Sequence, residues 1–287
     1  MLAVHRFMRV DTTLYQTELN EITFAMLELY NVVLYEPIFN AMIWLYHVLP
    51  GHDLGVAIIV LTVAIKVILF WPALSALKAQ KKLQDTQPMV EELRRKYKDN
   101  KEELGKQLME FYKNNKVNPF SSCLPILIQL PILIALYRAF FQGLQVDPAT
   151  HLLNATQAQH LYGFLQAIYT TTPIDTSMFG FIDLAATHNI ILAALAGVAA
   201  FFQAKTMQAK RAAIRTAGSK DEDMAATVNK QMMYLIPVLT IVFGYQFPAG
   251  VTIYWLVSTL FSLGQQLYFF RVRKQLATKP NVVDATK

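Results

Sequence analysis

One basic side chain, Lys66, stands in the middle of an apolar run, Val60–Phe70 (VLTVAIKVILF). The nearest charged residues are Asp53, thirteen positions before it, and Lys78, twelve positions after it. A lysine at the centre of a bilayer costs about 2.5–3.5 kcal/mol on insertion scales, so it is rare without a function. If this run crosses a membrane, Lys66 is a candidate for a hydrated cation that attracts a polar or acidic substrate.

Other polar side chains lie in the apolar runs of the chain. Thr62 precedes Lys66 by four residues, so the two share one helix face. Gln129 lies among prolines and can hydrogen-bond a neighbouring helix or backbone freed by those prolines. Arg138 is expected to extend outward to head groups. Gln203, Gln265 and Gln266 are further polar candidates, and the last two are equally compatible with a helix interface or a groove.

The sequence offers no arrangement for covalent or metal chemistry. No Asp or Glu lies inside any apolar run, so Lys66 is not half of a buried ion pair. The six histidines are scattered, and no phosphate-binding loop or nucleophile–base pair is present. The single cysteine, Cys123, cannot form an internal disulfide. We therefore expect no cofactor, no metal and no enzymatic activity.

The composition is typical of a membrane protein. Hydrophobic residues make up 54% of the 287 and charged residues 16%, against about 25% charged in soluble domains. Apolar runs of about 18 residues or more indicate membrane-spanning helices. Five runs meet or approach this length: Leu54–Leu74, Phe120–Gln142, Asn189–Met207, Gln231–Phe247 and Gly250–Phe270.

The basic residues predict the orientation of these spans. Of the 26 Lys and Arg, 22 lie in three segments, 75–118, 203–230 and 271–287, and none lies between Ala139 and Ala204. Lys and Arg are enriched in cytoplasmic segments. The pattern therefore predicts a cytoplasmic C-terminus and an N-terminus on the outer side. It also explains the net charge of +6 without a nucleic-acid partner.

Two further elements are predicted outside the spans. Residues 35–49 are hydrophobic, but Glu36, Asn40 and His47 fall on one helical face, which is typical of an amphipathic helix in the outer leaflet interface. Residues 75–118 are rich in helix formers and have a polar break at residues 98–101, so they predict an antiparallel helical hairpin whose first arm is kinked at Pro88.

The predicted order is an extracytoplasmic segment with the interfacial helix (1–53), span 1 (54–74), the cytoplasmic hairpin (75–118), span 2 (119–143), an extracytoplasmic loop (144–188), span 3 (189–207), a cytoplasmic loop (208–230), span 4 (231–248), span 5 (249–270) and a cytoplasmic tail (271–287).

Three stretches together resemble the YidC/Oxa/Alb family of membrane protein insertases. LTVAIKVILFWPALSALKAQ is similar to the first core span, where a Thr stands four residues before a basic residue. QLMEFYKNNKVNPFSSCLPILIQLPILIALYRAF is similar to the end of the cytoplasmic hairpin and the second span. FPAGVTIYWLVSTLFSLGQQ is similar to the last turn and span. The resemblance covers about residues 34–273.

The resemblance implies a five-helix core with a hydrophilic groove that opens to the cytoplasm and to lipid but not to the outside. In that family a basic residue, usually Arg, attracts the polar or acidic tail of an incoming membrane protein, and Lys66 occupies its position. Thr62 and Trp255 match substrate-contacting positions, and Gln129 and Gln203 match polar groove positions. With Gln265, these residues form the predicted substrate-binding groove.

We therefore expect an all-α polytopic insertase and chaperone in a bacterial inner membrane, of the YidC type without the large extracytoplasmic domain of Gram-negative members. Its expected partners are nascent membrane proteins and the lipid bilayer, with the ribosome and the Sec translocon as further candidates. A small secondary transporter or channel with Lys66 in the permeation path is the alternative. It is disfavoured by the cytoplasmic hairpin and by the lack of an internal repeat.

Overall fold

The computed structural model describes residues 12–118, 121, 124–144, 146–147, 149–207 and 220–278. This part of the chain is mostly helical, in agreement with the predicted all-α class. Parts of the predicted N-terminal segment, of the start of span 2 with Cys123, of the loop 208–230 and of the C-terminal tail lie outside the described residues.

The elements in chain order are α1 (Thr12–Tyr30), the π-helix η1 (Asn31–Tyr35), α2 (Glu36–Val48), α3 (Leu54–Ile68), α4 (Phe70–Asp85), α5 (Gln87–Lys96), α6 (Lys101–Asn114), α7 (Leu124–Arg138), the π-helix η3 (Ala139–Gly143), α8 (Ala155–Ala158), α9 (Gly163–Tyr169), strands β1 (Ser177–Met178) and β2 (Ile182–Asp183), α10 (Ile190–Thr206), α11 (Lys220–Gln246) and α12 (Ala249–Thr278).

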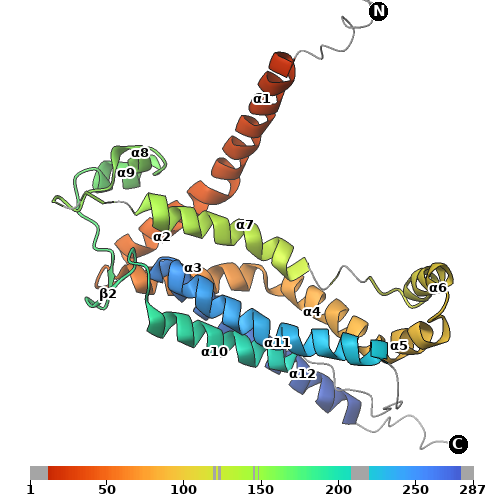
Figure 1. Cartoon of the computed structure of the whole chain (residues 1–287). Helices are drawn as coiled ribbons and strands as arrows, with labels where there is room; N and C mark the ends of the chain where they lie inside the picture. Colours follow the sequence, from red (N-terminus) through yellow and green to blue (C-terminus); the bar gives the residue numbers. More distant parts are fainter. Residues whose placement is uncertain are drawn as a thin grey trace, which may run out of the picture.

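The apolar helices form an elongated bundle in which α12 contacts α3, α7, α10 and α11 (Figure 1). The hairpin of α5 and α6 lies at one end of the bundle, and α8, α9 and the two strands lie at the other. Helix α1 projects away from the bundle. The bundle therefore carries its long connections at two opposite ends.

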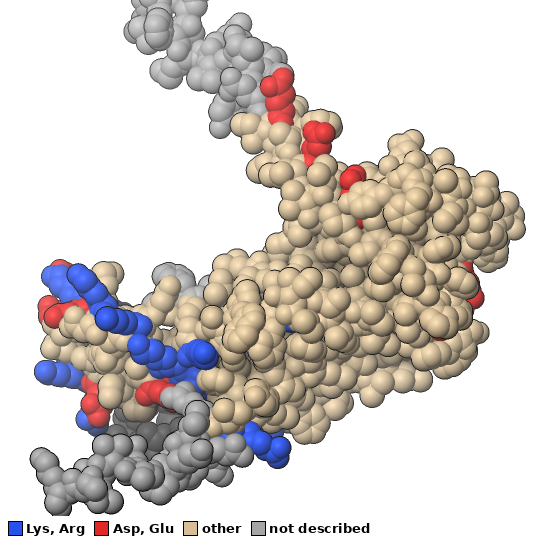
Figure 2. Space-filling model, turned by 180° about the vertical axis from the view of Figure 1, so that it is seen from behind, with Lys and Arg blue, Asp and Glu red and all other residues tan. Residues whose placement is uncertain are grey.

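Charge is segregated between these ends. On the face that Figure 2 shows, Lys and Arg gather at the hairpin end. A broad middle band has almost no charged side chains of either sign. Acidic side chains occur among the basic ones at the hairpin end, along the projecting helix and at the end opposite the hairpin. The enrichment of Lys and Arg in residues 75–118, from which a cytoplasmic hairpin was predicted, is thus seen in the structure as a basic end of the molecule.

The helices that are long and apolar enough to cross a bilayer are not the same as the predicted spans. Within the described part of the chain, one helix, Asn20–Val48, is long and apolar enough to cross a bilayer by itself. The helices Leu54–Ile68 and Phe70–Asp85 meet the same criterion only as a bent pair, and three apolar helices are shorter: Leu127–Phe141, Ile190–Thr206 and Met233–Gln246. Five spans and an interfacial helix at residues 35–49 therefore stay predictions.

The first predicted span, 54–74, is not one straight helix. It breaks at Leu69, and the axes of α3 and α4 differ by 63°. Pro72 explains the break, because it has no N–H to donate to the carbonyl of Ile68 four residues earlier. The structure also has no proline kink inside a helix at Pro88. Helix α4 ends at Asp85, and Pro88 lies in the first turn of the next helix, α5, where a proline is well tolerated.

Small residues bring α10 against α11. Ala193, Ala196, Gly197 and Ala200 are buried along one side of α10. A Cβ atom at Gly197 would lie 2.3 Å from a side-chain carbon of Ile241 on α11, so only glycine permits this approach. Close approach through small residues is how apolar helices associate in membranes, where lipid competes for apolar surface.

The main apolar core lies toward the end opposite the hairpin. It joins α2, α3, η3, the loop between η3 and α10 (the predicted outer loop) and the start of α12 through fully buried side chains such as Phe39, Ile58, Phe140, Leu165 and Tyr254. The polar face predicted for α2 is not left open to head groups. Asn40 donates from Nδ2 to the carbonyl of His160 and accepts at Oδ1 from the N–H of Tyr162.

Candidate functional site

Lys66 lies on α3 three residues before the break at Leu69. Its Nζ donates to Oε1 of Gln129 on α7 and to Oγ of Ser262 on α12, each at 3.3 Å. Among the described residues, no carboxylate lies within 4.0 Å of this ammonium. Three helices therefore meet at one cation that has neutral partners.

A cavity of about 390 Å³ opens beside Lys66, a size within the usual range for ligand sites. Apolar side chains of α4, α7 and α12 form much of its wall. Five of the six predicted groove residues line it: Lys66, Gln129, Gln203, Trp255 and Gln265. Residues from four helices, far apart in the sequence, are thus brought around one space.

The sixth predicted residue, Thr62, does not line this cavity. Its side chain is buried, with 1% of the residue exposed, and its hydroxyl donates to the carbonyl of Ile58 at 2.6 Å. A threonine inside a helix commonly forms this bond to the residue four positions earlier. Thr62 was predicted to lie in the groove because it shares a helix face with Lys66. It lies one turn away from Lys66, however, and its side chain is buried in the bundle.

The structure adds a polar stripe on α12 that the sequence analysis missed. Tyr254, Ser258 and Ser262 repeat every four residues and all line the cavity. The amide of Gln129 donates to the Tyr254 hydroxyl, and the Ser262 hydroxyl donates to the Ser258 carbonyl at 2.9 Å. The four-residue spacing within YWLVSTLFS was the available signal, because it places these hydroxyls on one face.

The break between α3 and α4 is stabilised from α12. Nε2 of Gln265 donates to the carbonyl of Phe70 at 3.1 Å, next to the turn that Pro72 disrupts. Its neighbour Gln266 accepts from the Thr206 hydroxyl of α10 at 2.6 Å. Gln265 therefore lines the cavity and also stabilises the bend that forms its wall.

The end of the bundle opposite the hairpin is closed by the loop between η3 and α10, which the sequence predicts to be the outer loop. Glu36 and His160 pair at 3.0 Å, and the hydroxyl of Tyr46 accepts from the N–H of Asp175. The Tyr169 hydroxyl lies 3.2 Å from Nδ1 of His47. Burial raises the pKa of Tyr169 to about 12. The polar face of α2 is thereby used to hold the loop.

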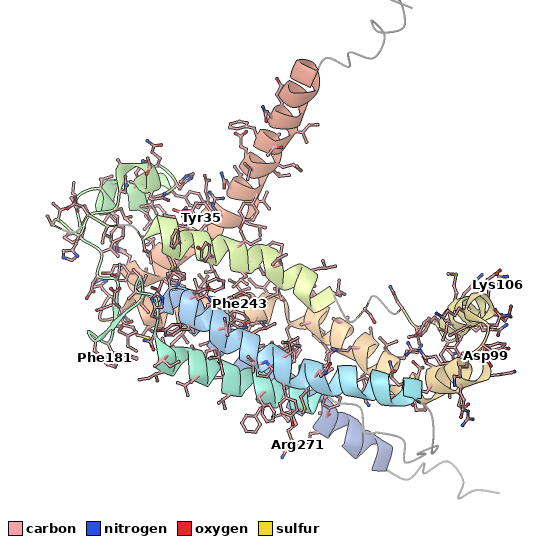
Figure 3. All side chains as sticks on the ribbon, viewed as in Figure 1. Tyr35, Asp99, Lys106, Phe181, Phe243 and Arg271 are labelled. Atoms are coloured by element: carbon pink, nitrogen blue, oxygen red, sulfur yellow. The ribbon has the colours of Figure 1, made fainter. Side chains whose placement is uncertain are left out.

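Arg138 belongs to this closure rather than to the cavity. The sequence predicted that it would extend to head groups, but its guanidinium lies 4.6 Å from the ring centre of Tyr35 and donates to Oδ1 of Asn31 at 2.6 Å. Figure 3 labels Tyr35 where the first helices meet α7. The prediction failed because the π-helix η1 brings a polar and an aromatic partner within reach.

The site can attract negative charge but has no nucleophile–base geometry. A single ammonium, amides and hydroxyls stand in a mainly apolar wall, and such an arrangement binds polar or acidic groups that leave water. Among the residues described, no group of three His, Cys, Asp or Glu is placed to hold a metal ion.

The chain is similar over most of its length to a family of membrane proteins. The family profile described as "60Kd inner membrane protein" matches residues 44–276. The chain is 33% identical to the membrane protein insertase YidC of Syntrophobacter fumaroxidans over 82% of its own length and 37% of that protein. It is 31% identical to the membrane protein insertase YidC of Lawsonia intracellularis over 88% of its own length and 40% of that protein.

A shorter relative is matched almost completely. The YidC of Fusobacterium nucleatum is 32% identical over 76% of this chain and 87% of that protein. By contrast, the chain spans only about two fifths of the length of the first two relatives. The shared region includes the break at Leu69 and all residues that line the cavity.

Proposed function

The chain belongs to the 60Kd inner membrane protein family, whose relatives named above are YidC membrane protein insertases, and from this premise we propose that it inserts membrane proteins. The cavity beside Lys66 receives the polar or acidic segment of a client that must pass through the apolar layer. The client's apolar segment moves sideways into lipid. No covalent step or cofactor takes part.

The cation without a carboxylate partner is the observation that carries this proposal. An ion pair would neutralise Lys66, whereas Gln129 and Ser262 leave its charge available to a substrate. Transfer of a client carboxylate into apolar surroundings is costly unless it is paired and hydrogen-bonded. A nearby ammonium lowers that cost, and burial of an apolar segment of about 20 residues provides the driving force.

The proposed arrangement in the membrane follows the charge distribution. The hairpin end, rich in Lys and Arg, faces the cytoplasm, and the end with the two strands faces outward. The proposal retains five core spans, with α3 and α4 sharing the first, and an outer interfacial position for α2. Nascent membrane proteins are the proposed clients, and the ribosome and the Sec translocon are proposed partners at the cytoplasmic side.

The alternative is a small transporter or channel that has Lys66 in its permeation path. Insertion is favoured because Gly250 and Ala249 of the α11–α12 turn donate backbone hydrogen bonds to Leu184 and Ala186 of the outer loop, at 2.9 Å each. Such contacts support a closed outer end. A continuous polar path would need an opening there.

The two functions are separated by reconstitution. Purified protein in liposomes should integrate a single-span client with a short acidic tail, so that the tail becomes protected from added protease. Lys66→Ala should lose most of this protection, while Lys205→Ala, which removes an exposed cation outside the cavity, should retain it. Solute flux without client integration would establish the transporter and contradict the insertase.

A further inference from the structure

The turn between β1 and β2 holds a bulky residue in an unusual backbone conformation. Phe179 has a φ of 51°, and Gly180, which follows it, has a φ of 74°. The N–H of Phe181 donates to the carbonyl of Met178 at 3.2 Å and closes the turn. Glycine adopts positive φ freely, but a bulky residue there is a genuine outlier that its surroundings must hold.

The first turn of α3 provides that support. Asp53 accepts at Oδ2 from the N–H of Phe179 at 2.6 Å, and its Oδ1 caps α3 by accepting from the N–H of Val56 at 3.0 Å. Met178 packs directly on Gly55, where a Cβ atom would lie 2.3 Å from the Met178 side chain. One carboxylate and one close contact thus fix the turn to the start of α3.

This support exposes aromatic rings instead of burying them. Phe179 is 59% exposed and Phe181 76% exposed, and their rings stack with centres 6.3 Å apart. Figure 3 shows Phe181 at the end of the molecule opposite the hairpin of α5 and α6, away from the bundle. A strained backbone that displays two apolar rings to water would bring no benefit to the fold alone.

We propose that this turn is a lipid anchor: Phe179 and Phe181 insert into the outer interfacial layer of the bilayer. The turn is bonded to Asp53, the residue immediately before the apolar helix α3, so it lies where that helix enters the membrane. Ile190 and Ile191 begin α10 and are also exposed. The proposal rests on the proposed orientation in the membrane but not on insertase activity.

The chemistry of the surrounding residues selects a neutral lipid surface. The charged residues on either side of the turn in the chain, Asp175 and Asp183, are acidic, and no Lys or Arg lies between Ala139 and Ala204. Attachment therefore depends on the apolar rings of the two phenylalanines, which enter the boundary between head groups and acyl chains. Attraction to anionic head groups contributes nothing, and high salt should not release the turn.

The anchor also fixes the depth of Lys66. Lys66 lies thirteen positions after Asp53, which corresponds to roughly 20 Å along a helix that rises 1.5 Å per residue. The hydrocarbon layer is about 30 Å thick, so an anchor at the outer surface holds the ammonium in its inner half. Loss of the anchor would let α3 shift along the membrane normal.

Depth-dependent quenching tests the anchor. A nitrobenzoxadiazole dye is attached to Phe181→Cys in a Cys123→Ser background, and the protein is reconstituted in phosphatidylcholine vesicles that contain nitroxide lipids. Nitroxides near the head groups should quench the dye, at low and at high salt. The same dye on Ala149→Cys, an exposed position in the outer loop, should be quenched only by aqueous iodide.

Two other quenching results would overturn the proposal. Quenching at position 181 by iodide alone would mean that the turn faces water. Quenching by neither agent would mean that protein covers it.

A second variant separates anchoring from packing. Phe179→Asn removes the ring but suits a positive φ and keeps the N–H that Asp53 accepts. Its Tm in detergent should equal or exceed that of the wild type, while nitroxide quenching at position 181 decreases. A marked fall in Tm would identify Phe179 as a packing residue and contradict the anchor.

The depth of α3 is tested with the dye on Ile68→Cys, a position 75% exposed beside Lys66. Combining it with Phe179→Asn and Phe181→Ser should change the ratio of quenching by shallow and deep nitroxides. An unchanged ratio would show that the turn does not set the depth of α3, even if it touches lipid.

Discussion

At the scale of single residues, the site consists of one ammonium whose position is fixed by neutral partners. Gln129 and Ser262 reach Lys66 from two different helices and leave its charge uncompensated. Tyr254 in turn accepts from the amide of Gln129, which holds the amide oxygen toward Lys66. These residues position the cation, so the proposed mechanism depends on them as well as on the cation itself.

Substitution of these partners should weaken insertion in a graded way. Ser262→Ala and Gln129→Leu each remove one of the two hydrogen bonds that hold Lys66, together with a second bond to Ser258 or to Tyr254. A hydrogen bond is worth about 0.5–1.5 kcal/mol, so loss of the bond to Lys66 should slow insertion of acidic-tailed clients by roughly two- to tenfold. Lys66→Arg keeps the charge and should retain activity. The measurement is the initial rate of tail protection in liposomes.

Clients with uncharged tails serve as the control, since their insertion should change little in all three variants. If Ser262→Ala and Gln129→Leu slowed both classes of client equally, the role assigned to the ammonium would be wrong.

At the scale of elements, close helix packing on one side contrasts with a bend on the other. Gly197 lets α10 approach α11, whereas Pro72 opens an angle between α3 and α4. The bend turns α4 toward the hairpin and makes room for the cavity beside Leu69. The closely packed pair α10 and α11 and the bent pair α3 and α4 thus form different parts of the same bundle.

Two glycine substitutions should separate packing from intrinsic helix preference. Gly197→Ala places a methyl group against Ile241 and should destabilise the protein by about 1–3 kcal/mol. Gly264→Ala in α12 meets nothing within 4 Å and should stabilise it by about 0.5–1 kcal/mol. Thermal unfolding in detergent should give a lower Tm for the first variant and an equal or higher Tm for the second. Equal Tm values would mean that α10 and α11 are not closely packed.

Local patterns predicted some elements well and missed the contacts between them. The apolar run Asn189–Met207 contains α10 almost residue for residue. The break at Leu69 was missed although Pro72 signals it, because a continuous apolar run was given more weight than one proline. The contacts of Lys66 with Gln129 and Ser262 join residues 63 and 196 positions apart, and helical periodicity contains no information about such distances.

At the scale of the whole molecule, the two ends of the bundle are built differently. The end that carries α8, α9 and the two strands is closed by backbone hydrogen bonds and by the polar face of α2, and Lys66 is not part of the apolar core there. The opposite end carries the basic hairpin. This polarity is what a device that admits clients from one side requires.

Thiol labelling should reveal the direction in which the cavity opens. Ser262→Cys in a Cys123→Ser background should react with a membrane-impermeant maleimide added from the cytoplasmic side and not from the outside. Thr62→Cys, at a buried position, should react from neither side. Labelling of position 262 from both sides would indicate a channel, and labelling from neither would mean that the cavity is inaccessible to water.

The uncompensated charge of Lys66 has a consequence for the orientation of clients. At about 8 Å and an effective dielectric constant near 20, a client carboxylate gains about 2 kcal/mol from this ammonium and a client lysine loses as much. The difference of about 4 kcal/mol corresponds to a rate ratio approaching a thousandfold, since each 1.4 kcal/mol is a factor of ten. In the proposed mechanism the cavity would therefore discriminate by the sign of charge, so that acidic flanks cross while basic flanks remain behind. An insertase of this kind would impose on its products the same distribution of lysine and arginine that it carries itself.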